Sequence, residues 1–181
     1  KHRRRQRQMC IRDSYKTLHN PKTDWCFKTE PDKTMENVSI PYPRGKTLGG
    51  SSSINGLLYI RGQEQDYDVW RQLGNKGWSW EEVLPYFIKA EDQERGKSEF
   101  HGQGGPLAVS DQRIKLDILN VFQNAANEVG IPKVDDFNRG DNFGCGYFQV
   151  TERNGLRCSA AVGYLNPCLL YTSPSPRDSF R

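Results

Sequence analysis

Several features that define common protein classes are scarce or missing in this 181-residue sequence. No run of about 18 apolar residues is present, so we expect no transmembrane helix. The five cysteines form no Cys-x-x-Cys pair, and no two of the three histidines stand at helical spacing, so no metal site is expected. Unpaired, scattered cysteines are typical of a reducing compartment, which predicts a cytoplasmic protein. These residues are Cys10, Cys26, Cys145, Cys158, Cys168, His2, His19 and His101.

Positive charge is concentrated at the start of the chain. The net charge is +4, but residues 1–12 contain six basic side chains and no acidic one, which leaves −2 for the remainder. A nucleic-acid-binding domain would need basic and aromatic residues together on its folded surface. Nucleic-acid binding through the basic arm is therefore the weaker alternative, and we expect no nucleic-acid partner.

The two ends differ in composition from the middle. Residues 1–14 have no apolar periodicity, and residues 168–181 end in a Ser/Pro run. Both ends contain Arg-Asp-Ser and resemble translated sequencing-adapter sequence, so we expect them to be non-native or disordered tails. A natural basic arm and a natural Pro-rich tail are the alternative. Residues 15–167 are expected to form the folded part.

The middle alternates helical and strand patterns, which predicts a mixed α/β fold. Apolar periodicity and capping residues predict helices over 66–73, from Ser79 onward with a kink at Pro85, and over 116–129. In the third helix one apolar face carries Leu119, Phe122, Ala126 and Val129. Strands are predicted over 105–109 and 147–151, a turn at Asn154-Gly155, and a short helix from Ser159 that ends before Pro167.

One glycine- and serine-rich loop, residues 49–53, is the strongest candidate for a binding site. Gly45-Lys46-Thr47 is not a P-loop, because the first glycine of that motif would fall on Ile40. Adjacent glycines allow backbone amides to approach a ligand, and serine hydroxyls can donate to a phosphate. Asn55 adds an amide suited to the edge of a heterocyclic ring. Composition alone leaves a surface turn without a ligand as the alternative.

The stretch PRGKTLGGSSSINGLLYIRGQEQDYDVW resembles the first signature of the glucose–methanol–choline oxidoreductases. The resemblance continues through GWSWEEVLPYF, FHGQGGPLAVSD and RNGLRCSAAVGYLNP, and is closest to the branch of choline- and alcohol-dehydrogenase-like enzymes. It implies part of a Rossmann-like FAD-binding domain with the start of the substrate-side region. The positions that agree in the first signature are Gly45, Lys46, Leu48, Gly49, Gly50, Ser51, Ser52, Ile54, Asn55, Tyr59, Gly62 and Asp68.

The resemblance also implies an activity and a set of cofactor contacts. The family oxidises alcohols to carbonyl compounds and transfers the hydride to N5 of FAD. The implied contacts are Thr47, Gly49, Gly50, Ser51, Ser52, Asn55, Gly56, Leu57 and Leu58. Some members attach FAD through a histidine just before the asparagine; here that position is Ile54, which implies non-covalent FAD.

Other family parts are not found in this sequence. No G-x-G-x-x-G motif precedes residue 43, and the family's catalytic histidine belongs to a C-terminal region. His101 matches a structural turn of the family, so no residue here is expected to be catalytic. We therefore expect an internal fragment that is inactive alone, acting in its parent on a small alcohol with an unknown electron acceptor. The alternative is a non-catalytic ligand- or protein-binding module on the same scaffold.

Overall fold

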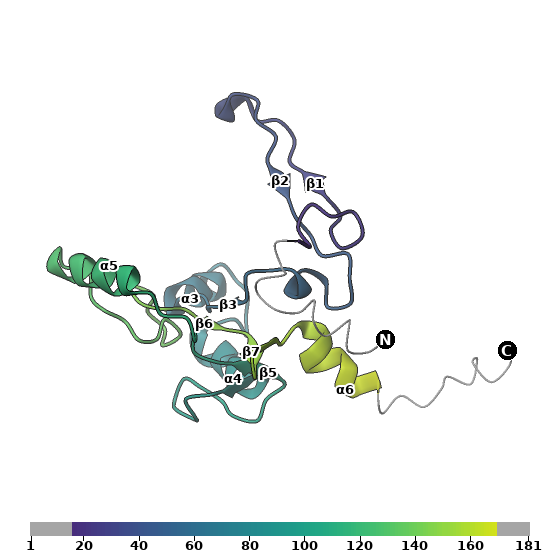
Figure 1. The fold of residues 1–181 in the computed structure, drawn as a ribbon. Helices are drawn as coiled ribbons and strands as arrows, with labels where there is room; N and C mark the ends of the chain where they lie inside the picture. Colours follow the sequence, from purple (N-terminus) through teal and green to yellow (C-terminus); the bar gives the residue numbers. More distant parts are fainter. Residues whose placement is uncertain (1–15, 170–181) are drawn as a thin grey trace, which may run out of the picture. The chain divides into compact units, whose positions relative to one another are not determined.

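The computed structural model describes residues 16–169 as two compact units (Figure 1). The first unit contains the residues up to Leu57 together with those from Arg153 on, and the second contains Leu58–Glu152. The predicted tails 1–14 and 170–181 lie outside the described residues. Cys168 and Leu169, which we had placed in the C-terminal tail, lie in helix α6, Asn166–Leu169.

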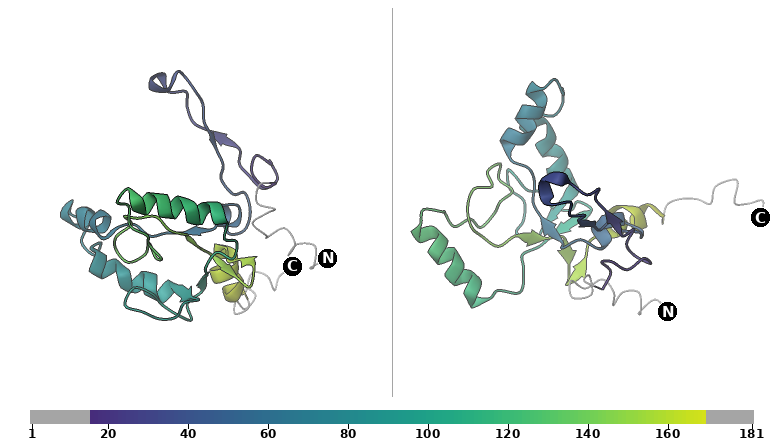
Figure 2. Two further views of the ribbon diagram at one scale, coloured as in Figure 1. Left: turned by 60° about the vertical axis from the view of Figure 1, so that its left-hand side comes forward. Right: turned by 90° about the horizontal axis from the view of Figure 1, so that it is seen from above.

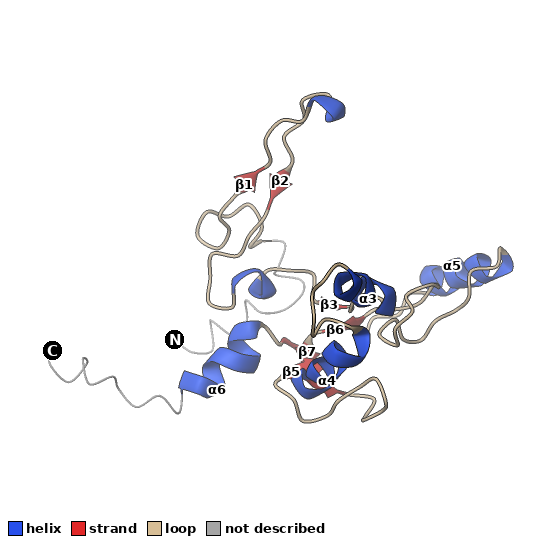
Figure 3. Cartoon of the chain, turned by 180° about the vertical axis from the view of Figure 1, so that it is seen from behind, coloured by secondary structure: helices blue, strands red, loops and turns tan. Residues whose placement is uncertain are grey.

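The described residues contain four two-stranded sheets, and their helices and strands are short with long loops between them (Figure 3). One of these sheets is parallel. None of the helices in residues 16–169 is long and apolar enough to cross a membrane. The mixed α/β composition agrees with the prediction from sequence.

In the first unit, β1 (Phe27–Lys28) pairs antiparallel with β2 (Pro41–Tyr42), and the 3-10 helix η2 (Lys33–Met35) lies between them in sequence. The buried carboxylate of Asp24 fixes the base of this hairpin. It accepts backbone N–H bonds from His19, Cys26 and Arg44. These hydrogen bonds hold the pKa of Asp24 below its ordinary value, and the bond from the Cys26 amide has the largest effect.

The first unit also contains the 3-10 helix η3 (Gly50–Ser53) and the strand β8 (Leu156–Arg157). Strand β8 pairs with β7 (Glu152–Arg153) across the predicted turn, where Asn154 and Gly155 both have positive φ. The chain then forms the π-helix η4 (Ala161–Leu165) and continues into α6. The prediction that Pro167 ends this helix is wrong. Asn166 keeps right-handed helical dihedral angles, so the helical path runs past the proline.

In the second unit, β3 (Leu58–Tyr59) pairs antiparallel with β6 (Gln149–Val150). The parallel pair joins β4 (Glu91–Gln93) to β5 (Leu107–Val109). Helix α4 (Trp80–Ala90) leads directly into β4, and the predicted capping box between Ser79 and Glu82 is formed at its start. Pro85 lies inside this helix, which continues beyond it.

Helix α3 (Glu64–Gln72) contacts α4, whereas α5 (Asp117–Glu128) lies apart from both helices in the view from above (Figure 2). Helix α5 was predicted with nearly correct ends. Its apolar face, however, is not buried: only Ala126 is, while Leu119, Phe122 and Val129 are exposed. The periodicity therefore identified the helix correctly but not its surroundings in this chain.

Candidate functional site

The predicted cofactor loop is a tight turn whose glycines have structural roles. Gly49 and Gly50 have φ values of 86° and 54°, in the left-handed region that favours glycine. A Cβ atom on Gly45 would lie 2.2 Å from the carbonyl oxygen of Gly50. A Cβ atom on Gly49 would lie 2.6 Å from the Ser53 hydroxyl. The close approach of residues 45 and 50 therefore requires glycine.

The serine hydroxyls hold this turn together. Ser51 Oγ accepts the Gly45 amide, and Ser53 Oγ donates to Leu48 O at 2.7 Å. Ser52 Oγ donates to Gly49 O and accepts the Ala160 amide at 2.9 Å, which ties the turn to the start of η4. We had expected these hydroxyls to be available to a phosphate. The O–H groups of Ser52 and Ser53 instead donate within the first unit, whereas Ser51 Oγ only accepts there, so its O–H group can still donate to a ligand.

Part of the expected row of exposed backbone amides is also used inside the turn. The Gly50 amide donates to Thr47 O at 2.9 Å, and the amides of Ile54 and Asn55 both donate to Ser51 O. These three amides are therefore not available to a ligand. A short 3-10 turn satisfies its own amides where a flat loop would leave them exposed.

Asn55 is exposed at the end of this turn and is held by two donors. Its side-chain oxygen Oδ1 accepts the Leu57 amide at 3.1 Å and the Arg157 guanidinium (Nη1) at 2.6 Å. Arg157 also donates to Ser52 O at 3.1 Å and to Asn55 O at 2.8 Å. One arginine therefore binds both the backbone and the side chain at the end of η3.

Arg157 is only 3% exposed, and burial lowers the pKa of its guanidinium from the ordinary value. This residue is not among the contacts predicted from the sequence. No local pattern links it to Asn55, because 102 positions separate the two residues and only the folded hairpin β7–β8 brings them together. The one available signal was its position inside the RNGLRCSAA segment of the resemblance.

Of the other predicted contacts, Gly56 and Leu57 lie in the first unit and Leu58 lies in the second. Leu57 is 1% exposed with φ of 68°, so its side chain packs inward and only its backbone borders the loop. Gly56 is exposed, with no atom within 4 Å of the position of a Cβ. Leu58 belongs to the second unit, where it pairs with Val150 in the sheet and is 52% exposed. Eight of the nine predicted residues therefore lie in the first unit.

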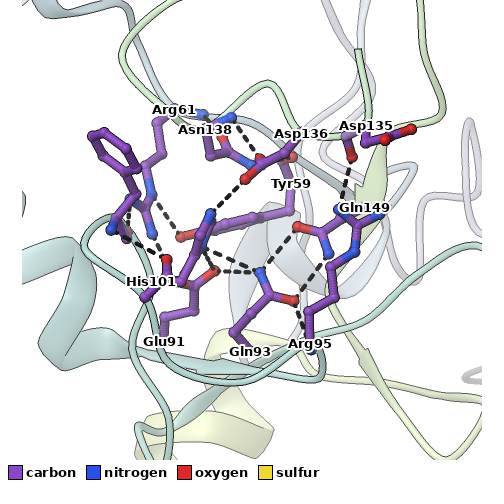
Figure 4. A network of polar contacts seen from close by, with 12 residues as sticks. Tyr59, Arg61, Glu91, Gln93, Arg95, His101, Asp135, Asp136, Asn138 and Gln149 are labelled. Carbon is purple, nitrogen blue, oxygen red and sulfur yellow. Dashed lines mark hydrogen bonds and ion pairs between the residues drawn. The ribbon is translucent and has the colours of Figure 1, made fainter.

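A second polar cluster lies within the second unit and is centred on His101 (Figure 4). His101 Nδ1 lies 2.9 Å from Glu91 Oε2, and its Nε2 lies 2.7 Å from Asp136 Oδ2. Glu91 also accepts from Arg61 Nη2 at 2.7 Å and, through its other oxygen, from the Gln93 side chain. Because carboxylates only accept hydrogen bonds, two of them facing both ring nitrogens favour the imidazolium form.

The electrostatics of this cluster favour a protonated His101. Burial alone would lower the pKa of His101, but hydrogen bonds to Asp136 and Glu91 raise it to about 9. Burial alone would raise the pKa of Asp136, but the hydrogen bonds from His101 and from the Asn138 amide, together with the nearby positive charges, lower the pKa of that carboxyl group. A histidine that keeps its proton at neutral pH is a poor general base. It is also nearly buried, which agrees with the predicted role as a turn residue.

The described part of the chain offers little other catalytic chemistry. Residues 16–169 contain no group of three or more His, Cys, Asp or Glu side chains placed to hold a metal ion. Four cysteines in this part form no disulfide, and Cys158 is buried. Within the predicted cofactor segment, Asn55 and Gly56 are exposed and so remain accessible to a ligand.

Comparison with known proteins gives consistent relatives. At the level of sequence, the chain is 41% identical over 146 residues to an oxygen-dependent choline dehydrogenase of Sinorhizobium fredii, covering 81% of this chain and 27% of that protein. It is 40% identical over 166 residues to an alcohol dehydrogenase [acceptor] of Pseudomonas putida, covering 86% of this chain and 30% of that one. The chain thus spans less than a third of the length of these curated relatives.

Solved structures show the same relationship. Pyridoxine 4-oxidase from Mesorbium loti matches with a TM-score of 0.81 and 28% identity, covering 87% of this chain and 31% of that one. An FAD-dependent oxidoreductase from Chaetomium thermophilum matches with a TM-score of 0.75 and 29% identity, covering 84% and 30%. The profile of the glucose–methanol–choline (GMC) oxidoreductase family matches residues 28–172. The chain therefore belongs to the GMC oxidoreductases and contains part of their N-terminal, FAD-binding domain.

Proposed function

We propose that the whole protein is an FAD-dependent oxidoreductase that acts on CH–OH groups and converts an alcohol to an aldehyde or ketone. The observation that carries this proposal is the family match, which includes the complete Gly45–Leu58 segment. The relatives named choline dehydrogenase and alcohol dehydrogenase support a small alcohol as the substrate. The electron acceptor differs even between those two names, so the proposal leaves it open.

Two glycines of the turn leave open space that a flat cofactor could occupy. Gly56 needs neither a positive φ nor space for a neighbouring atom, since nothing lies within 4 Å of its Cβ position. Gly50 needs its backbone conformation but likewise faces open space. Bare backbone at an exposed position allows a planar ring system to approach closely. We propose Thr47, Gly49, Gly50, Ser51, Ser52, Asn55, Gly56, Leu57 and Leu58 as the segment that borders FAD.

The chain's own residues shape and orient this border. Arg157 and the Leu57 amide hold Asn55 at the end of the turn, and the serine hydroxyls keep the turn closed. FAD, when bound, supplies the hydride acceptor for alcohol oxidation. Ile54 supports non-covalent attachment, because its side chain cannot bond to a flavin and is packed inside the first unit at 4% exposure.

Two broader assignments complete the proposal. We assign residues 15–167 to the family domain and keep 1–14 outside it. The family match to residue 172 and helix α6 support adding residues 168–172 to this domain. We place the protein in the cytoplasm, because the four cysteines within residues 16–169 form no disulfide bonds.

The test is a titration of the isotopically labelled 181-residue chain with FAD, followed by NMR. A well-formed site buries most of its ligand, and this chain supplies only one side of it, so binding should be weak. The purified chain should be colourless and should not reduce a dye with alcohols. Added FAD should shift the backbone resonances of residues 47–58 at lower FAD concentrations than those of the β1–β2 hairpin. An unresponsive loop would contradict the flavin role and favour a non-catalytic module.

A further inference from the structure

Arg157 carries an inference that extends the proposed flavin role and rests on it. The side-chain amide of Asn55 has one fixed direction in this structure. An asparagine amide can normally present either its oxygen or its NH₂ group to a ligand. Here two donors, the Leu57 amide and Arg157 Nη1, converge on Oδ1 at 3.1 and 2.6 Å. Turning the amide over would place its NH₂ group against both donors, so the orientation is fixed.

This direction leaves the NH₂ group of Asn55 available to a ligand. Within the described residues, the Asn55 Nδ2 group donates to no other atom, and the residue is exposed. Asn55 therefore offers a ligand two N–H donors and no side-chain acceptor. The oxidised flavin ring and the FAD phosphates both present hydrogen-bond acceptors at their edges, so they are suitable partners for such a donor.

The fixed direction of the Asn55 amide depends on Arg157. Its guanidinium binds Ser52 O, Asn55 O and Asn55 Oδ1 together, so it joins the carbonyl groups at the end of η3 to the side chain. The planar group has several donors in a fixed geometry, which suits such multiple contacts better than the single ammonium group of lysine. Its burial at 3% exposure keeps water from competing for these oxygens.

We propose that Arg157 is a positioning residue that commits Asn55 to donate a hydrogen bond to an acceptor atom of the flavin cofactor. Arg157 itself does not contact the cofactor in this proposal; it acts through Asn55.

The experiment compares four variants of the full chain by NMR, thermal unfolding and FAD titration. Arg157→Met keeps the length of the side chain but removes its donors, and Arg157→Lys restores one cationic donor group. Asn55→Asp keeps the acceptor for Arg157 but has no N–H. Arg153→Met is the matched control, because Arg153 lies exposed in the same hairpin.

In the wild type, FAD should shift the side-chain NH₂ resonances of Asn55. Arg157→Met should lose this shift, expose the Leu57 amide to faster hydrogen exchange and weaken FAD binding about two- to tenfold, the value of one hydrogen bond. Arg157→Lys should restore part of both effects, and Arg153→Met should match the wild type. Asn55→Asp should lose FAD affinity while keeping its unfolding temperature.

The possible failures are distinguishable. If FAD shifts the Asn55 resonances in Arg157→Met as it does in the wild type, the positioning role is wrong and the flavin role stands. If Asn55→Asp binds FAD as the wild type does, the donor role of Asn55 is wrong. If FAD leaves the whole 47–58 segment unshifted in the wild type, the proposed function itself fails. Should Arg157→Met not fold, the comparison of Arg157→Lys with Asn55→Asp decides the question.

Discussion

Replacing His101 by glutamine should remove most of the dependence of stability on pH between neutral and alkaline conditions. In the folded chain, Asp136 and Glu91 raise the pKa of His101 from 6.5 to about 9. A group whose pKa is raised by folding stabilises the folded state while it is protonated. This stabilisation is fully present below pH 6.5 and is lost as the pH rises through about 9.

The size of the effect follows from the shift. Each pKa unit corresponds to about 1.4 kcal/mol, so the rise from 6.5 to about 9 contributes about 3 kcal/mol to the free energy of unfolding. The side chain of His101 is 7% exposed, so solvent screens this interaction little. Glutamine at this position keeps some hydrogen bonding but has no charge to lose.

The assay is urea unfolding of the 181-residue chain at about pH 6 and about pH 9.5, conditions that bracket the titration. The wild type should lose about 3 kcal/mol between them. His101→Gln should be less stable at the lower pH and change much less. His19→Gln is the matched control, because His19 is exposed, and it should follow the wild type. Parallel loss of stability in the wild type and His101→Gln would refute the ion-pair role of His101.

Two glycine substitutions separate the folding of the loop from its binding. The Cβ atom that Gly56→Ala adds would face open space, so this variant should be as stable as the wild type or have a free energy of unfolding about 0.5 kcal/mol higher. It should nevertheless bind FAD more weakly in the NMR titration. Unchanged FAD affinity would exclude Gly56 from the site. Gly45→Ala would place its Cβ atom 2.2 Å from Gly50 O and should lower the unfolding temperature markedly, whereas a stable variant would show that the turn can relax.

The sequence predicted the elements whose signals are local. The capping box at Ser79 and Glu82, the turn at Asn154-Gly155 and the ends of α5 depend on neighbouring residues, and all are present in the structure. The end of α3 is also local, since Gly74 follows the C-cap residue with a positive φ and its amide donates to Arg71 O.

Features set by distant contacts could not be predicted. Strand β4 contains three polar residues, of which Glu91 and Gln93 are buried, and only distant contacts such as the pairing with β5 and the ion pair of Glu91 with Arg61 explain this burial. Arg157 reaches Asn55 across 102 positions. The serine hydroxyls were expected to face a phosphate, but the close return of the chain at Gly45 and Ala160 gives them nearer partners.

The central claim is that the Gly45–Leu58 segment borders FAD in an alcohol-oxidising enzyme. The most direct measurement replaces the matching 146-residue segment of the Sinorhizobium fredii choline dehydrogenase with that of this chain and records the flavin absorption spectrum of the purified chimera. Our account predicts a yellow protein whose FAD is released by denaturation and whose absorption is bleached by an alcohol substrate. A chimera that folds with the cooperative unfolding of the parent enzyme but contains no flavin would contradict it.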